Sequence, residues 1–326
     1  MGTTWTAGAR LLRPTDRLGS AYAMLVLAGV FWGSNLIAGR ALAEHAPPAM
    51  LNFLRWSVAL AVLLPLAWPR MRDQWIVVRQ HLPQILILGT LGITAFNSLL
   101  YAGLSQVPAM NVGIISGMSP ATTVAIAVLA GQERLPPRRA AGVLLAVAGA
   151  LVVITRGDPG LLQSLALGSG EALVVASVLC GSSYTVLLRR FAVPLPPIGL
   201  LAAMCLVGVA ESAPLAAWEL AATGRQVAWS WEVALLVAYV GLLPSVGSML
   251  LFNIGVARVG AGTAGLFITF IPISAAALAV VLLGEPLRWF HALGLALVLS
   301  GVVASLVGRA VTTTPRAVVS LAWRRE

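Results

Sequence analysis

Six polar or aromatic side chains stand within long apolar stretches of the sequence, where residues of these types could bind a small solute. They are Trp32, Asn35, Asn97, Tyr101, Tyr184 and Asn253. A polar side chain in a hydrocarbon-spanning segment must face the bundle interior or a cavity. Asn97 and Tyr101 are four residues apart and therefore share one face of a helix. Amides and hydroxyls hydrogen-bond a solute without reacting with it, so the pattern favours binding, although each residue alone could equally join neighbouring helices.

The same stretches contain one deep carboxylate and two prolines. Glu211 lies well inside its stretch and is the candidate for a proton-coupling group. Pro120 and Pro272 each remove a backbone hydrogen bond in mid-helix, which predicts paired kinks that could serve as hinges. Arg55 lies nearer the end of its stretch, and we expect its side chain to reach the membrane interface and pair with Glu44.

Two further carboxylates stand in predicted turns. Glu133 lies in GQERLPP and Glu285 lies in LGEPLRW, each between two apolar stretches. The first N–H groups of a helix have no partner within that helix, and a carboxylate can accept hydrogen bonds from them. We expect each of these two residues to bond the helix that follows it and to be structural.

The residues that catalysis needs are missing from this pattern. His45, His81 and His291 fall in or near predicted loops, and the sequence has no HExxH, no GxSxG and no cluster of metal ligands. All 21 basic residues are arginine, so there is no lysine for a Schiff base or a phosphate-binding loop. Cys180 and Cys205 lie in apolar stretches and are expected to be unpaired buried thiols. We therefore expect no enzyme activity, no cofactor and no metal.

Composition indicates a membrane protein. Of the 326 residues, 59% are hydrophobic and only 10% are charged, and the mean hydropathy is +0.92. Soluble domains are usually about a quarter charged, so a soluble enzyme is excluded. The formal net charge of +10 is scattered between apolar stretches and not gathered on one face. This distribution favours topology signals over nucleic-acid binding and leaves the lipid bilayer as the expected surroundings.

Ten apolar stretches predict ten membrane-spanning helices. They cover residues 21–42, 49–68, 84–103, 108–130, 137–155, 167–188, 197–218, 231–254, 260–283 and 288–308. A helix of about 20 residues spans about 30 Å, the thickness of the hydrocarbon core. Strands of a membrane barrel would alternate polar and apolar residues, and these stretches do not. The predicted fold class is an all-α integral membrane protein.

The arginines predict the orientation of these helices. With a cytoplasmic N-terminus, sixteen of the 21 arginines fall in cytoplasmic segments and four in outside loops. An excess of positive charge in cytoplasmic loops is the general rule, so both termini are expected in the cytoplasm. Residues 1–20 lack the short apolar core and cleavage site of a signal peptide, and we expect the first helix to act as an uncleaved insertion signal.

The chain repeats itself at a shift of 152 residues. Residues 99–152 laid on residues 251–304 give 15 identities in 54 positions, among them Pro120 with Pro272. Tyr101 and Asn253 become equivalent in this pairing. Each half would hold five helices, and because five is odd the second half must cross the membrane in the opposite sense. We therefore expect two inverted five-helix repeats. The expected units are a tail at 1–20, repeats at 21–155 and 167–308, a connecting loop at 156–166 and a tail at 309–326.

Four short patterns resemble those of EamA-type members of the drug/metabolite transporter superfamily. They are FWGSN in the first stretch, PPAMLNFLRW at the second, GQERL after the fourth and LGEPL after the ninth. The resemblance covers residues 20–308 and implies ten helices in two inverted repeats in a bacterial inner membrane. It also implies export of amino acids or related metabolites through a central cavity formed by both repeats, and it favours the six side chains named first. GQE in place of the family's usual GE affects only the geometry of one turn.

These observations predict a secondary transporter that exports a small zwitterionic or neutral metabolite by alternating access between two rocking halves. The sparse charge within the spans disfavours a strongly anionic solute such as a sugar phosphate. One alternative is an exporter of hydrophobic drugs, with Trp32, Tyr101 and Phe270 forming an aromatic pocket. Another is a lipid-handling or purely structural bundle without an aqueous cavity. The sequence leaves the substrate, the coupling ion and the oligomeric state open.

Overall fold

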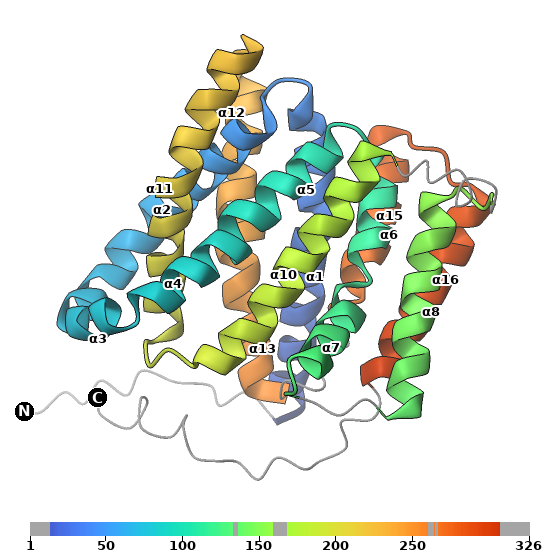
Figure 1. The fold of residues 1–326 in the computed structure, drawn as a ribbon, viewed down its shortest axis with the longest axis horizontal. Helices are drawn as coiled ribbons and strands as arrows, with labels where there is room; N and C mark the ends of the chain where they lie inside the picture. Colours follow the sequence, from blue (N-terminus) through green and yellow to red (C-terminus); the bar gives the residue numbers. More distant parts are fainter. Residues whose placement is uncertain (1–13, 133–135, 159–167, 260–263, 265–266, 307–326) are drawn as a thin grey trace, which may run out of the picture.

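The computed structural model describes residues 14–132, 136–158, 168–259, 264 and 267–306, and every regular element in these ranges is helical (Figure 1). The elements of the first half are α1 (Pro14–Ala43), α2 (Pro48–Asp73), α3 (Trp75–Gln80), α4 (Leu82–Gly89), η1 (Thr90–Ala95), α5 (Phe96–Leu104), α6 (Ala109–Ser116), α7 (Ser119–Leu129) and α8 (Pro137–Ile154). Those of the second half are α10 (Ser169–Phe191), α11 (Pro197–Thr223), α12 (Trp231–Gly241), η2 (Leu242–Gly247), α13 (Ser248–Val259), α15 (Phe270–Leu283) and α16 (Trp289–Leu306). The segments η1 and η2 are π-helical.

Eight helical segments of the described chain are long and apolar enough to cross a membrane. They are Gly19–Ala43, Pro48–Pro69, Leu82–Leu104, Ala109–Leu129, Pro137–Ile154, Ser169–Phe191, Pro197–Thr223 and Trp231–Val256. The predicted stretches 260–283 and 288–308 correspond to the shorter apolar helices Phe270–Leu283 and Trp289–Ala304. Residues 260–263 and 265–266 of the ninth stretch lie outside the described residues. Ten spanning helices therefore stay a prediction.

Prolines and glycines mark where several of these helices begin and end. Pro48 and Pro197 occupy the first positions of α2 and α11, where a missing N–H is tolerated. Gly224, with φ 66°, and Gly284, with φ 65°, follow α11 and α15 in the left-handed conformation that ends a helix at low cost. Proline at the first position and glycine after the last residue therefore define where these helices begin and end.

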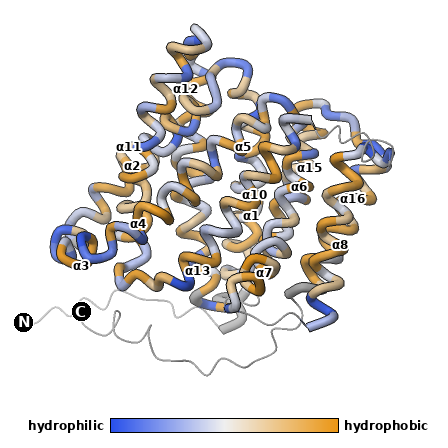
Figure 2. Tube along the Cα trace, viewed as in Figure 1, coloured by the Kyte–Doolittle hydropathy of each residue, from blue (hydrophilic) through white to orange (hydrophobic). Residues whose placement is uncertain are grey.

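Apolar side chains both fill the interior and cover the outside. Figure 2 shows hydrophobic residues along the helices and hydrophilic ones mainly near their ends and turns. Large apolar side chains remain exposed, among them Leu129 at 87%, Val281 at 77% and Leu144 at 69%. A soluble monomer rarely exposes so much apolar surface, whereas a bilayer would cover it. The described chain therefore has the surface of a membrane protein.

Helices of the two halves are interleaved. α1 packs against α13 and α15 of the second half, and α10 packs against α5 and α7 of the first half. α2 pairs with α11, and α8 pairs with α16 at one end of the bundle (Figure 1). The first helix of each half therefore packs mainly against helices of the other half.

The bounds of several elements recur at the shift of 152 residues. α8 begins and ends 152 residues before α16, and η1 stands 152 residues before η2. A π-helical turn is rare and is often found at functional sites. The two halves therefore share an irregular feature as well as their regular helices.

Helix interruptions precede the two in-register prolines. α6 ends at Ser116 and α7 begins at Ser119, so Pro120 lies in the first turn of α7. Pro272 is the third residue of α15. A Cβ atom added at Gly117 would lie 3.1 Å from Pro272 Cγ, which places the two interruptions side by side. The expected mid-helix position of both prolines is therefore wrong, because each lies in a first helical turn, where no intrahelical hydrogen bond is lost. A role as hinges stays a prediction.

We expect the Gly33→Ala variant to be destabilised by about 1–3 kcal/mol through overpacking. A Cβ at Gly33 would collide with Ser274 Oγ and lie 2.9 Å from the Ala275 nitrogen, at the contact of α1 with α15. Gly19→Ala is the matched control, because a Cβ at this position of the same helix would meet nothing within 4 Å. Thermal unfolding in detergent measures both. Equal melting temperatures for the two variants would contradict the close packing at Gly33.

Candidate functional site

A buried arginine is the centre of a polar cluster in the bundle interior. Arg55 of α2 is 5% exposed. Its Nε donates to Ser245 Oγ at 2.8 Å, and its Nη1 donates to Asn97 Oδ1 at 2.8 Å and to Tyr101 Oη at 3.1 Å. Asn97 and Tyr101 come from α5, whereas Ser245 comes from η2 in the second half. One guanidinium group therefore joins elements of both halves.

The two π-helical segments supply and orient acceptors for this arginine. Ser245 Oγ, within η2, donates to the carbonyl oxygen of Val240 at 2.8 Å, five residues earlier. Asn97 Nδ2, just after η1, donates to the carbonyl oxygen of Ile93 at 3.0 Å and of Gly92 at 3.3 Å. Because the donor groups of both side chains are used on the backbone, their oxygen lone pairs remain for Arg55. The two π-helical segments therefore orient the neutral acceptor oxygens of Ser245 and Asn97 toward the Arg55 guanidinium group.

Tyr101 connects the arginine to α1. Its hydroxyl donates to Asn35 Oδ1 at 3.0 Å, so toward Arg55 the same oxygen acts as an acceptor. Asn35 is 5% exposed and Tyr101 is 1% exposed. The cluster of Asn35, Arg55, Asn97, Tyr101 and Ser245 is called the Arg55 cluster below.

Aromatic rings flank the cluster. The guanidinium carbon of Arg55 lies 5.1 Å from the centre of the Trp56 ring and 5.9 Å from that of Tyr101, within the range of cation–π attraction. On the neighbouring part of α1, Ser34 Oγ and Tyr239 Oη are 2.5 Å apart. The site therefore combines one cation, neutral hydrogen-bonding groups and aromatic faces.

The structure brings three of the six predicted cavity residues together, and these are Asn35, Asn97 and Tyr101. Trp32 instead packs its ring 5.3 Å from that of Phe252. The Tyr184 ring lies against η1, where a Cβ added at Gly92 would be 2.7 Å from it.

Asn253 lies apart from the cluster. It is exposed on α13, on the face that also exposes Leu250 and Ile254. Its repeat-equivalent residue, Tyr101, is buried. Equivalent backbone positions in the two halves therefore place their side chains in different surroundings.

The expected position of Arg55 at the membrane interface, paired with Glu44, is wrong. The side chain is held inside the bundle because Asn97, Tyr101 and Ser245 satisfy its donors there. A pattern in α2 points the same way, because Leu51, Arg55 and Ala59 recur every four residues on the buried face. Ser245 was not predicted, because its role depends on the π-helical turn of η2.

Glu211 forms a second polar contact beside η1. Its carboxylate accepts hydrogen bonds from Thr90 Oγ1 and Thr94 Oγ1, each at 2.6 Å. The side chain is half-buried on α11. Thus η1 carries residues that bind Glu211 and immediately precedes a residue that binds Arg55.

Two carboxylates of the second half bond the starts of first-half helices. Glu285 accepts from the backbone N–H of Ala109 at 2.7 Å and of Met110 at 2.9 Å, at the start of α6. The expectation that Glu285 bonds the following helix, α16, is therefore wrong. Pro108 precedes α6 and has no side-chain acceptor, so a distant residue takes that place. Glu133 lies outside the described residues.

Glu219 makes the corresponding contact with α2, which sequence analysis missed. Its Oε2 accepts from the backbone N–H of Ala49 at 2.8 Å and of Met50 at 3.1 Å. The residue before α2 is again a proline, Pro47. Both helix starts therefore depend on glutamates that are far away in the sequence.

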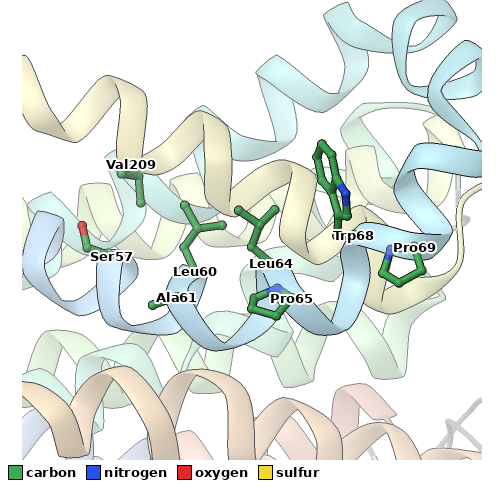
Figure 3. A pocket seen from close by; sticks show the side chains of 8 residues that line it. All are labelled: Ser57, Leu60, Ala61, Leu64, Pro65, Trp68, Pro69 and Val209. Atoms are coloured by element: carbon green, nitrogen blue, oxygen red, sulfur yellow. The ribbon is translucent and has the colours of Figure 1, made fainter.

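An apolar groove of about 640 Å³ lies on the outside, along α2 (Figure 3). Its lining residues are Ser57, Leu60, Ala61, Leu64, Pro65, Trp68, Pro69 and Val209. Val209 belongs to α11 and the other lining residues belong to α2, and none of them is a member of the Arg55 cluster. The groove is therefore separate from the Arg55 cluster. Within the described ranges, no three residues of the His, Cys, Asp and Glu types gather to hold a metal ion.

Comparisons with known proteins give one consistent result. The model of the EamA-like transporter family matches residues 19–155 and again residues 168–307. The chain is 24% identical to YyaM, an uncharacterized transporter of Bacillus subtilis, over 87% of this chain and 92% of that protein. It is 28% identical to a probable terminal-alkyne amino-acid exporter of Streptantibioticus cattleyicolor, over 88% of this chain and 93% of the relative.

Two further proteins are similar to this chain over most of its length. A probable amino-acid metabolite efflux pump of Salmonella typhimurium is 25% identical, over 90% of this chain and 97% of the pump. A solved crystal structure matches 90% of this chain and 99% of its own chain with a TM-score of 0.63 at 23% identity, a likeness that concerns the fold alone.

Proposed function

The chain belongs to the EamA-like transporter family, and from that premise we propose that it exports a small amino acid or a related zwitterionic or neutral metabolite by alternating access. The observation that carries the proposal is the Arg55 cluster, a polar site buried between elements of both halves. Two relatives named for amino-acid export or efflux support the solute class. As a member of this family the protein is a membrane transporter and not an enzyme.

Inverted repeats are the proposed basis of the transport cycle. The reciprocal packing of α1 with α13 and α15, and of α10 with α5 and α7, is what a two-fold axis between the halves would produce. The matching bounds of α8 and α16, and of η1 and η2, support the same relation. Five spans in each half would make that axis lie in the membrane plane. Two similar halves can then rock about a site that they share.

The proposed location is the inner membrane of a bacterium, with both termini in the cytoplasm. The excess of arginine in the segments assigned to the cytoplasmic side supports this orientation. Bacterial relatives named as transporters support the membrane.

The proposed cavity is built on the Arg55 cluster. Trp32 and Tyr184 would contribute aromatic walls, and Asn253 would contribute from the exposed face of α13. Pro120 and Pro272 would serve as hinges, because the interruptions that precede them lie side by side. A drug-binding aromatic pocket gains less support, since Phe270 stacks on Phe267 at 5.8 Å and Trp32 packs on Phe252.

Counterflow into proteoliposomes loaded with each of the twenty amino acids tests this function. We expect exchange of a subset of them. Single cysteines at positions 97 and 253, in a variant lacking Cys180 and Cys205, should react with a water-soluble reagent from one side at a time. Absence of exchange, together with inertness of both cysteines from both sides, would support a packed structural bundle instead.

We expect Glu211→Gln to remove the dependence of exchange on an imposed pH gradient while leaving exchange itself in place. Glutamine keeps one acceptor oxygen for the two threonine hydroxyls, which bond different carboxylate oxygens of Glu211, but it cannot take up or release a proton. Glu44→Gln is the control, because Glu44 is exposed between α1 and α2. Counterflow at imposed gradients measures the difference. Wild-type exchange that is indifferent to the gradient would remove Glu211 from the mechanism.

A further inference from the structure

The positive charge of Arg55 has no protein counter-charge in the part of the chain that the structure describes. The group is 5% exposed, and its described bonds all go to neutral oxygens of Ser245, Asn97 and Tyr101. An ion pair between Arg72 and Asp73 lies elsewhere, on exposed side chains. A cation inside a membrane bundle is costly to bury, and one kept there without an acidic partner is a candidate functional group.

Part of the guanidinium group also remains available. It has five N–H donors in a flat fork, and the described bonds use Nε and Nη1. Nη2 has no acceptor among the described residues. The neighbouring indole N–H of Trp56 is buried and likewise has no acceptor there, although its ring lies 5.1 Å from the guanidinium carbon. Two donors from consecutive residues thus lack acceptors among the described residues.

The surrounding groups hold the fork in place without neutralising it. The hydroxyl protons of Tyr101 and Ser245 are donated to Asn35 Oδ1 and to the carbonyl oxygen of Val240, so both oxygens turn lone pairs toward Arg55. The amide of Asn97 is anchored on the η1 carbonyls in the same way. No further acceptor completes this arrangement among the described residues, and an external group with negative charge would both fill the free position and neutralise the cation.

We propose that Arg55 binds the carboxylate group of the exported solute, an inference that rests on the transport function proposed above. The N–H groups of Nη2 remain for a carboxylate, which would accept a charge-assisted hydrogen bond from the guanidinium group. One cation suits one carboxylate, so the solute class is a monocarboxylate such as a zwitterionic amino acid. Neutral amides and amines of the same shape lack the charge that this site requires. Arg55 is then a specificity-determining residue in the cavity.

Selectivity of the wild-type protein is the first test. Proteoliposomes are assayed by counterflow with the twenty L-amino acids and with the carboxamide of each one exchanged. We expect each acid to be preferred at least about tenfold over its carboxamide, the effect of losing a charge-assisted hydrogen bond. Equal exchange of acids and carboxamides would overturn the role of Arg55 and leave the proposed transport function standing.

Variants of Arg55 give the second test. Arg55→Gln should lower amino-acid exchange about 10- to 100-fold and abolish the preference over carboxamides, whereas Arg55→Lys should keep part of that preference. Arg258→Gln is the matched control, because Arg258 is exposed and bonds Ser20 Oγ on the surface. An unchanged preference in folded Arg55→Gln protein would refute the proposal.

A binding measurement separates this proposal from the transport function. Benzoate, but not benzamide, should raise the melting temperature of purified wild-type protein and should leave that of Arg55→Gln unchanged. If benzoate stabilises the wild type through Arg55 while no amino acid is exchanged, the carboxylate site stands and the proposed function fails. If benzoate and benzamide act alike on the wild type, the carboxylate site is refuted.

Discussion

Asn97→Asp is expected to yield a folded protein that no longer exchanges its solute. Asn97 Oδ1 lies 2.8 Å from Arg55 Nη1, so an aspartate there would place a permanent carboxylate against the guanidinium group. The pair would satisfy the charge of Arg55 within the protein and compete with any external acceptor. We expect exchange to fall about 100-fold, the equivalent of about 2.7 kcal/mol, while the protein stays folded because the new ion pair offsets the loss of the Asn97 Nδ2 bonds to the Ile93 and Gly92 carbonyl oxygens.

Asn97→Leu separates this effect from a loss of structure. Leucine removes an acceptor from a buried cation, which should destabilise the fold by about 2–4 kcal/mol in addition to stopping exchange. Thermal unfolding and counterflow on the same preparations distinguish the two variants. Wild-type exchange by the aspartate variant would show that Arg55 does not bind the solute.

Glu285→Ala should cause the largest loss of stability among the predicted substitutions. The carboxylate accepts hydrogen bonds from the N–H groups of Ala109 and Met110, both in fully buried residues at the start of α6. Without it the two donors have no acceptor, and each unsatisfied buried donor costs about 1–3 kcal/mol, so we expect a total of about 2–6 kcal/mol. The free energy of unfolding in detergent measures this change.

Glu285→Gln and Glu232→Ala complete that comparison. Glutamine keeps one acceptor oxygen, so its variant should fall between wild type and Glu285→Ala. Glu232 is exposed in the first turn of α12, and its replacement should change stability little. If Glu285→Ala unfolds no more easily than Glu232→Ala, the contact with α6 does not stabilise the protein.

Features that depend on local sequence could be predicted well. Apolar stretches indicated where helices lie, and the stretches predicted to begin at residues 49 and 197 correspond to α2, which begins at Pro48, and α11, which begins at Pro197. The spacing of Asn97 and Tyr101 predicted that both would share a face, and the structure buries both beside Arg55. A helical period of 3.6 residues is enough for such predictions.

Features that depend on partners distant in the chain could not be predicted. Whether Arg55 reaches the interface or turns inward depends on acceptors from α5 and η2, and the orientation of Ser245 depends on a π-helical turn. The glutamate that bonds the start of α6 is 176 positions away from it. Tyr101 and Asn253 show the limit of repeat arguments, because equivalent backbone places do not guarantee equivalent neighbours.

The origin of the two glutamates has a consequence for biosynthesis. Glu219 and Glu285 belong to the C-terminal half but complete the starts of α2 and α6 in the N-terminal half. A ribosome delivers those helices into the bilayer well before it has translated either glutamate. Until the C-terminal half is synthesised, the N-terminal half therefore lacks the carboxylates that accept hydrogen bonds from the first N–H groups of α2 and α6. A product truncated after the first repeat would keep these N–H groups unsatisfied and would be a substrate for quality-control proteases.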